Sequence, residues 1–292
     1  MVNSAYSLIE HLGKTLWASR WREGCLAVYS AYFDASGQET DKYVAVSGFI
    51  VHANTWIDWE RDWLECLVRR EIVNKHGDPE FHMSDCANCE YFFEGWEETR
   101  EQERQHLLHD LADIISSHLS RKASCIIKVD EYIKHIDQDL REDFGMSGAY
   151  VLGGRTCAAR IKEWCKKEKL PALPDVKFFF EHGDPKELQL DLRHRFLEDD
   201  YPEPLFMRKK NRYSDTGKLL DHGLVPFQAS DILAYLTNQD AKFSNRRDWG
   251  KKQNIRWMHE QLSPIPEPTC NFPPDYFAGI NTLLRVCKHN LL

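Results

Sequence analysis

Three consecutive aromatic residues followed by an acid constrain the fold of this chain more than any other feature. Phe178–Phe180 follow Val176 and Lys177 and run directly into Glu181. Such a short run is typical of a strand buried on both faces, which requires other structure above and below it. A carboxylate at the end of this strand loses its hydration unless it is protonated, paired or bound to a metal ion. The run therefore predicts a central strand with a functional acid at its end.

Two further acids stand beside apolar elements. Asp34 ends the apolar run 26–33, and Asp231 lies early in an apolar helix that Pro226 opens. In two-metal phosphoryl-transfer sites, carboxylates from separate rigid elements hold divalent ions about 3.5–4 Å apart. Oxygen ligands suit Mg²⁺ or Mn²⁺. Asp34, Glu181 and Asp231 are thus candidate catalytic and metal-binding residues, although any one of them alone is more typical of a cap, an ion pair or a surface charge.

Apolar patterns along the chain predict a mixed α/β sheet flanked by helices. Residues 25–34 and 43–51 have strand composition and are separated by a turn sequence, which predicts a hairpin. Further strands are predicted over 124–129, 176–181 and 205–208, with helical segments between them.

The predicted helices have distinct faces. A helix capped by Thr55 carries Trp56, Trp59 and Trp63 at helical spacing, which indicates core packing rather than a base-stacking surface. A long helix is predicted over 97–119, and another begins at Asp184.

The helix that carries Asp231 is expected to be amphipathic. Gln228, Asp231 and Tyr235 share one face by their spacing, and Ile232 and Leu233 lie on the other. The spacing therefore does not force Asp231 into the core.

The chain divides into three parts. Residues 1–24 are expected to form a helical extension, and residues 25–260 an α/β domain with helical insertions. Residues 261–292 are expected to form a Pro-rich linker and a C-terminal helix that packs on the core. A length of 292 residues is sufficient to bury a core of this size.

Charge is distributed unevenly. The formal net charge of −8 argues against a generally basic nucleic-acid coat protein. Residues 205–256 nevertheless contain 11 Lys and Arg against 5 Asp and Glu, around Asp231. A charge run is most often a solvated face, but this position favours contact with phosphates. The candidate nucleic-acid-binding residues are Arg208, Lys209, Lys210, Arg212, Arg246 and Arg247.

The nine cysteines follow no disulfide framework. The chain contains neither a recognisable signal peptide nor an apolar run long enough to span a membrane. We therefore expect a cytoplasmic protein with reduced thiols.

Secondary candidates surround the main acids. Glu80 and His82 flank the apolar Phe81, as on an edge strand, and are candidates for a fourth ligand or a general base. A solvated edge is the more common explanation for such a pair. Asp130 ends a predicted strand and competes with Glu181 for the central position.

Five segments together resemble the proteins grouped as domain of unknown function 3800, for which an RNase H-like fold is expected. The resemblance spans roughly residues 25–245, and the order of the segments is more specific than any one of them. The segments are Tyr32–Gly37, Val46–Val51, Glu80–Asp85, Phe179–Asp184 and Pro226–Tyr235.

This resemblance implies that Asp34, Glu181 and Asp231 are the metal-binding acids of a nuclease that cleaves DNA or RNA with Mg²⁺ or Mn²⁺. One position departs from the family, because Ala35 stands where an acid is usual. If that acid orients metal or water, activity is reduced or lost. If it merely lies in the turn, nothing is lost. The alternative is a non-catalytic module that binds nucleic acid or a protein partner, such as an accessory subunit in a phage-defence or mobile-element system.

Overall fold

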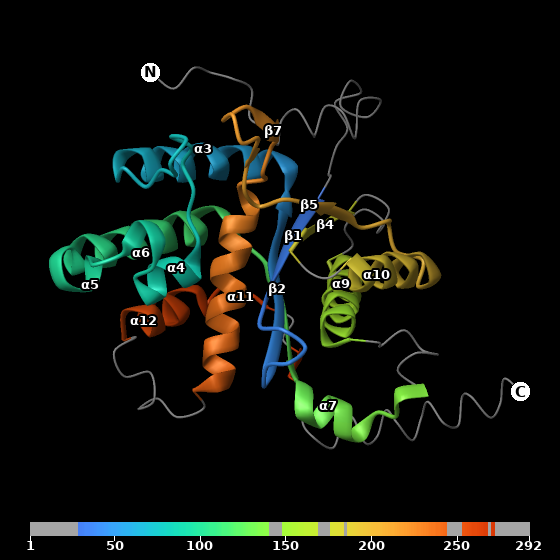
Figure 1. The fold of residues 1–292 in the computed structure, drawn as a ribbon. Helices are drawn as coiled ribbons and strands as arrows, with labels where there is room; N and C mark the ends of the chain where they lie inside the picture. The colour runs from blue at the N-terminus through green and yellow to red at the C-terminus, as the bar shows by residue number, and fades with distance from the viewer. Residues whose placement is uncertain are drawn as a thin grey trace, which may run out of the picture.

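The computed structural model describes residues 29–139, 148–168, 176–183, 186–243, 253–267 and 270–271. They form a mixed sheet with helices on both faces (Figure 1). The predicted extension over 1–24 and the predicted C-terminal helix lie outside these residues.

The sheet confirms the predicted mixed α/β architecture. Its main strands have the order β5-β4-β1-β2-β3, and the short β8 pairs with β3. The strand β2 is antiparallel to both β1 and β3, whereas β1, β4 and β5 are mutually parallel. The five predicted strands are all present, and most boundaries shift by a few residues. The bounds are β1 (Tyr29–Ser36), β2 (Tyr43–His52), β3 (Lys122–Lys128), β4 (Val176–Glu181), β5 (Leu205–Met207) and β8 (Cys270–Asn271).

The aromatic run is buried on both faces of β4, as predicted. Phe179 stacks on Tyr32 with ring centroids 4.6 Å apart, on the face that α11 covers. Phe180 stacks on Phe33 at 5.2 Å, on the opposite face. Alternation along a strand thus divides one sequence run between two separate cores.

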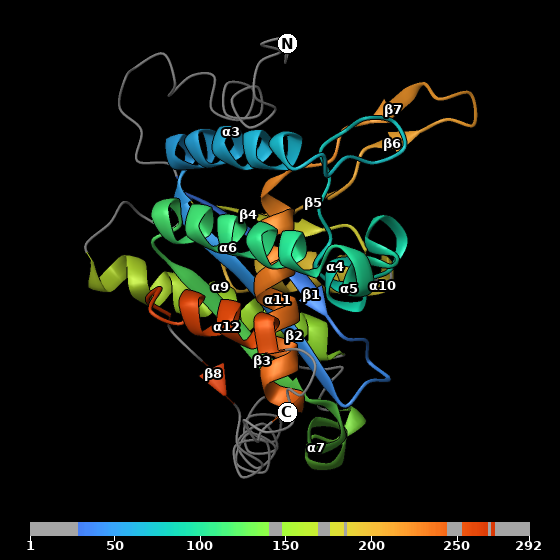
Figure 2. The same ribbon diagram turned by 90° about the vertical axis from the view of Figure 1, so that its left-hand side faces the viewer.

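Helices cover each face (Figures 1 and 2). One core contains side chains from α3, α4, α6, α11 and α12, and the other contains side chains from α7, α9 and α10. The bounds are α3 (Ala53–Arg69), α4 (Met83–Asn88), α5 (Trp96–Thr99), α6 (Glu101–His118), α7 (Val129–His135), α9 (Ala149–Lys167), α10 (Lys186–Glu198), α11 (Pro226–Lys242) and α12 (Gln253–Leu262), with a 3₁₀ turn η1 at Tyr91–Phe93.

The tryptophan stripe of α3 lies in the core, as predicted. Trp56, Trp59 and Trp63 are fully buried. The predicted cap was wrong, because the helix begins at Ala53 and its N-cap is His52. The His52 ring nitrogen Nδ1 accepts a hydrogen bond from the Asn54 backbone N–H at 3.2 Å.

Two predicted elements, an edge strand over 80–82 and a continuous helix over 97–119, were wrong because the backbone takes another course there. Residues 80–82 do not form an edge strand, because the Phe81 N–H donates to the side-chain oxygen of Gln228 at 3.0 Å instead of to a strand. The predicted helix over 97–119 is broken at Arg100, where φ is −134° and ψ is 25°.

The helix α11 is more deeply buried than predicted. All residues from Pro226 to Gln239 are buried, including Asp231. One side of α11 packs on β1 and β2, and other sides contact α4 and α12. The helical spacing did not force Asp231 into the core, but packing on all sides of α11 buries it.

A two-stranded hairpin, absent from the predictions, projects beyond the main sheet. It consists of β6 (Arg212–Tyr213) and β7 (Leu219–Asp221) and stands next to the loop that follows α3 (Figure 2). Hydrogen bonds from Asn211 and Tyr213 to Asp78 connect the hairpin to that loop.

Candidate active site at the carboxyl end of the central strands

Strand register brings Asp34 and Glu181 together. Phe33 pairs with Phe180 in the parallel β1–β4 ladder, and the two acids follow this pair directly. Because Tyr32 and Phe179 face α11, side-chain alternation turns Asp34 and Glu181 to the same face. The acids thus meet at one edge of the sheet although they are far apart in sequence.

The third acid is supplied by α11, which is fixed to the sheet by two side chains. Ser230 Oγ donates a hydrogen bond to the Tyr32 carbonyl oxygen at 2.7 Å. Asn238 Nδ2 donates to the carbonyl oxygens of Ser36 and Tyr43, at 2.7 and 3.1 Å. These contacts set the position of the helix along β1 and place Asp231 opposite Asp34.

A buried lysine bridges these two carboxylates. Lys209 Nζ lies 2.8 Å from Asp34 Oδ2 and 3.0 Å from Asp231 Oδ1. The exposed fractions of these side chains are 9% for Lys209, 6% for Asp34 and 10% for Asp231. Lys209 was predicted to contact phosphate at the surface. It instead lies between Asp34 and Asp231, and these three side chains are hereafter the acid cluster.

Burial and neighbouring charges perturb every member of this cluster. Burial raises the pKa of Asp34, against the opposing effect of Lys209. Burial also favours the neutral form of Asp231, but Lys209 and His82 outweigh it and lower the pKa of that carboxyl. For Lys209, burial is likewise outweighed by the two aspartates, and its pKa is raised. The lysine is therefore charged and holds the pair together as a buried ion-pair network.

Glu181 lies next to this network and is more exposed than its partners. Burial and the charge of Asp34 raise its pKa, whereas Lys209 opposes the shift. Gly183 lies against the Glu181 carboxylate, and a Cβ at position 183 would require that carboxylate to move. Such a perturbed acid in a cleft is typical of functional sites.

His82 approaches the cluster from the loop before α4. Its Nε2 lies 3.5 Å from Asp231 Oδ1, and its Nδ1 lies 2.9 Å from Asp85 Oδ1. The Met83 N–H donates to Asp231 Oδ2 at 2.7 Å, which fixes this loop against α11. A carboxylate behind an imidazole is the arrangement that orients a histidine for proton transfer.

The cluster opens into a cavity of about 840 Å³. Predicted residues Asp34, Glu181, Asp231 and His82 all line this cavity, together with Lys209. The loop from β1 to β2 forms another wall, where Gly37 has a φ of +90° and a Cβ would collide with the Tyr43 carbonyl.

The donor set has the chemistry of a hard divalent cation, since it consists of carboxylate oxygens. In the described part of the chain, however, no group of three or more His, Cys, Asp or Glu side chains is arranged to hold a metal ion. The Lys209 ammonium lies between the carboxylates instead. A metal ion at Asp34 and Asp231 would have to displace this ammonium.

Ala35 lies on the other side of β1 from Asp34. It packs against the core that contains α9 and α10, and its N–H donates to Asp34 Oδ1 at 2.7 Å. The side chain at position 35 therefore starts from the sheet face opposite the carboxylate cluster, although Ala35 also lines the cavity into which the cluster opens.

The remaining predicted site residues lie outside the cluster. Glu80 forms an ion pair with Lys210 at 2.9 Å, and both line a second cavity together with Arg212. Arg208 lies 3.5 Å from Asp221. Two further predicted positions, Arg246 and Arg247, fall outside the described residues.

Asp130 does not compete for the site. It lies in the first turn of α7, is largely exposed, and pairs with Lys128 at 3.5 Å. The central position therefore belongs to Glu181.

No family model, curated protein or solved structure matches this chain. None of the described helices is both long and apolar enough to cross a membrane.

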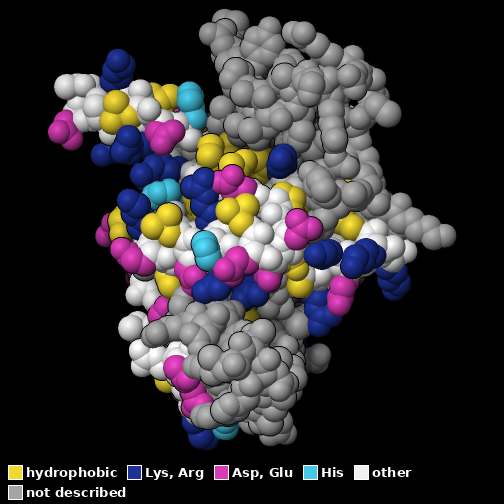
Figure 3. Space-filling view, turned by 90° about the vertical axis from the view of Figure 1, so that its right-hand side faces the viewer, with side chains coloured by type: hydrophobic (Ala, Val, Ile, Leu, Met, Phe, Trp, Pro, Cys, Tyr) yellow, Lys and Arg dark blue, Asp and Glu magenta, His cyan; other side chains and the backbone are white. Residues whose placement is uncertain are grey.

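The face over α9 and α10 carries both signs of charge. Figure 3 shows basic and acidic side chains interspersed there. Ion pairs such as Arg155–Asp199, Arg160–Glu163 and Arg195–Glu198 account for part of this pattern. This face therefore offers a polyanion alternating charges instead of a continuous basic stripe.

Proposed function

We propose that this chain is a metal-dependent nuclease with an RNase H-like domain, which hydrolyses phosphodiester bonds in DNA or RNA. The observation that carries the proposal is the convergence of Asp34, Glu181 and Asp231 on one cavity. Two of them come from the ends of adjacent parallel strands and one from a facing helix.

The sheet supports the finer fold assignment. In the order β5-β4-β1-β2-β3, only β2 runs antiparallel to the others. An acid on the first strand, another on the neighbouring parallel strand and a third on the last helix is the arrangement that the family resemblance implies.

Asp34, Asp231 and Glu181 would hold Mg²⁺ or Mn²⁺ in place of the Lys209 ammonium. Bound there, such an ion would activate water and stabilise the leaving oxygen. His82 presents Nε2 on the same cavity and is oriented from behind by Asp85, which suits it to accept or donate a proton. Lys209 would then be free to contact the substrate phosphate.

A second candidate function is a non-catalytic binding module on the same fold, acting with nucleic acid or a protein partner. The position of Lys209 favours it, since the ammonium already neutralises two of the acids. The two functions differ in whether a divalent ion enters the cluster.

Metal-dependent cleavage of labelled single- and double-stranded DNA and RNA tests the proposal. Mn²⁺ or Mg²⁺ should support cleavage by the full chain and EDTA should stop it. Asp34→Asn should reduce cleavage by at least about 100-fold, as expected when a group acting in the transition state is removed. The matched control is Asp130→Asn, an exposed acid that does not line the cavity, and its cleavage should stay within about two-fold of the unmodified chain.

Thermal unfolding separates the two candidate functions. A ligand that binds only the native state raises its stability, so Mn²⁺ should raise the melting temperature of the nuclease and not that of Asp34→Asn. Absence of both cleavage and a Mn²⁺-dependent shift would favour the binding module. Equal cleavage by Asp34→Asn would reject the site assignment.

A further inference from the structure

A second, larger cavity adjoins the acid cluster. Its volume is about 1160 Å³, and His82 lines both cavities. The two are also connected along the chain, because Lys209 lines the first and Lys210 the second. Small-molecule pockets typically measure about 300–1,000 Å³, so this space suits a segment of a polymer better than one small ligand.

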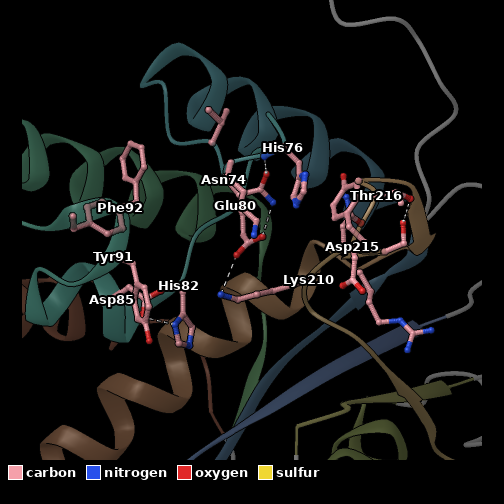
Figure 4. Close-up of a pocket in the computed structure, with 18 residues that line it drawn as sticks. Asn74, His76, Glu80, His82, Asp85, Tyr91, Phe92, Lys210, Asp215 and Thr216 are labelled. Carbon is pink, nitrogen blue, oxygen red and sulfur yellow. Dashed lines mark hydrogen bonds and ion pairs between the residues drawn. The ribbon is translucent and has the colours of Figure 1, made fainter.

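Aromatic rings stand at this cavity in an unusual state of exposure. Tyr91 is 81% exposed and Phe92 is 40% exposed, and both extend from η1 along one side (Figure 4). Phe92 packs against Trp96 in a tilted arrangement, with ring centroids 5.6 Å apart. A large exposed ring supported in this way offers a flat apolar surface to a ligand.

The backbone of Tyr91 is also strained. Its φ is +52°, in the left-handed region that favours glycine, and a bulky side chain there is uncommon. Strain of this kind is found where a side chain must be held for function. The conformation keeps the Tyr91 ring at the cavity.

A second aromatic pair stands at the hairpin side of the cavity. His76 and Tyr213 are stacked with centroids 3.9 Å apart and an interplanar angle of 20°. The Tyr213 hydroxyl donates to Asp78, and Asn211 Nδ2 donates to the same carboxylate at 3.0 Å. The hairpin and the loop after α3 therefore present their rings as one unit.

Basic side chains accompany these rings. Lys75 and Arg212 are exposed, line the cavity, and have no carboxylate within ion-pair distance among the described residues. Lys210 reaches between Glu80 and His82 and is paired with Glu80 (Figure 4). Asp215 lies at the hairpin tip, so basic and acidic side chains both line the cavity.

We infer that this cavity, hereafter the outer cavity, binds single-stranded nucleic acid next to the phosphodiester bond to be cleaved. Bases would stack on Tyr91 and Phe92 and on the His76–Tyr213 pair, and Lys75 and Arg212 would contact phosphates. The bases must be unpaired, because the faces of bases inside a duplex are covered by neighbouring base pairs and cannot stack on protein side chains. The inference rests on the proposed nuclease function, since it assigns the strand that leads into that site.

Fluorescence anisotropy with the full chain in EDTA tests binding without cleavage. The probes are labelled 20-residue oligo-dT, oligo-U and a duplex of the same length. Single strands should bind more tightly than the duplex, and DNA and RNA arms identify the sugar that is preferred. Tyr91→Ala should weaken binding of single strands about 5- to 100-fold, which is the usual effect of removing one stacking ring.

Two further variants keep the test independent of folding defects. Tyr91→Gly removes the ring while relieving the left-handed backbone, so weakened binding by this variant cannot be assigned to misfolding. Arg212→Ala should reduce the dependence of log affinity on log salt by about one unit. The control is Leu190→Ala, an exposed apolar residue on α10, which should bind as the unmodified chain does.

The inference is overturned if the duplex binds as tightly as single strands, or if Tyr91→Ala and Tyr91→Gly bind normally. Its failure is distinct from failure of the proposed function. Single-strand binding without Mn²⁺-dependent cleavage would support the outer cavity and reject the nuclease. Mn²⁺-dependent cleavage together with normal single-strand binding by the Tyr91 variants would support the nuclease and reject the outer cavity as the binding site.

Discussion

The ion pairs of the two adjoining cavities differ in how deeply they are buried. In the acid cluster, the side chains of Asp34, Asp231 and Lys209 are almost entirely buried, and each aspartate lies within 3.0 Å of the Lys209 ammonium. In the outer cavity, Lys210 and Glu80 form a pair with exposed fractions of 44% and 19%. The first arrangement depends on every partner being present, whereas the second is screened by water.

This difference indicates where function constrains the chain. A buried ion-pair network is often no more stable than an apolar replacement of the same volume, so its presence is weak evidence for a stabilising role. Groups that are maintained at such a cost are more readily explained by chemistry at the site. In the outer cavity, the features that suggest a functional constraint are the exposed aromatic rings and the left-handed backbone of Tyr91.

Removing the lysine from the cluster should give the largest change in stability. Lys209→Met leaves Asp34 and Asp231 buried without their cation, which should lower the free energy of unfolding by about 3–5 kcal/mol. Urea denaturation at pH 7 measures this loss. Because the variant lacks the ammonium, Mn²⁺ should restore more stability to it than to the unmodified chain.

The matched control is Lys210→Met in the outer cavity. Loss of its exposed pair with Glu80 should change stability by less than about 1 kcal/mol. Equal effects of the two substitutions would remove the distinction between the cavities.

A smaller change of opposite sign is expected at Glu181. Its pKa is raised in the folded chain, so the folded state holds the proton more tightly than the unfolded state does. The stability that Glu181 contributes is therefore highest below its ordinary pKa of 4.5 and declines as the pH rises through the raised value. Glu181→Gln should be more stable than the unmodified chain at pH 7, and this advantage should disappear below about pH 4.5.

Denaturation curves from pH 3.5 to pH 8 test this sign. The control is Glu80→Gln, which loses an ion pair and should gain no stability at pH 7. A Glu181→Gln variant that is less stable than the unmodified chain at pH 7 would show that the carboxylate is favourably paired.

The smallest effect on stability is expected at Tyr91 in the outer cavity. Tyr91→Gly relieves the left-handed conformation, which costs about 1–2 kcal/mol for other residues, but increases the entropy of the unfolded chain. A net gain of about 0.5–1 kcal/mol should accompany weaker binding of single strands. Glu71→Gly is the control, because Glu71 has a φ of +58° but does not line the cavity. Glu71→Gly should gain stability with no change in the binding of single strands. If Glu71→Gly also binds single strands more weakly, the loss of binding in Tyr91→Gly is not specific to the Tyr91 ring.

The sequence predicted those parts of the site that depend on local pattern. The run Phe178–Phe180 identified a strand buried on both faces, and its end located Glu181. The apolar run before Asp34 identified the neighbouring strand in the same way. Parallel pairing of these strands then makes the acids neighbours.

The rest depended on tertiary contacts that no local pattern records. Lys209 belongs to a basic run that resembles a solvated surface, and only the return of the chain from β5 carries it between two aspartates. The spacing of α11 did not require the face that carries Asp231 to be buried, but α4 and the loop before it cover that face. Tyr91 lies in a short turn without periodicity, where neither its exposure nor its φ could be predicted.

The position of β1 has a consequence for synthesis of the chain. β1 lies between β2 and β4, but β4 begins about 140 residues after β1 ends. At roughly 5–20 residues per second, one edge of an apolar strand therefore waits about 7–28 seconds on the ribosome for its partner. An unpaired apolar edge is a template for aggregation. Until β4 emerges, the edge of the strand that carries Asp34 stays open to pairing with other chains.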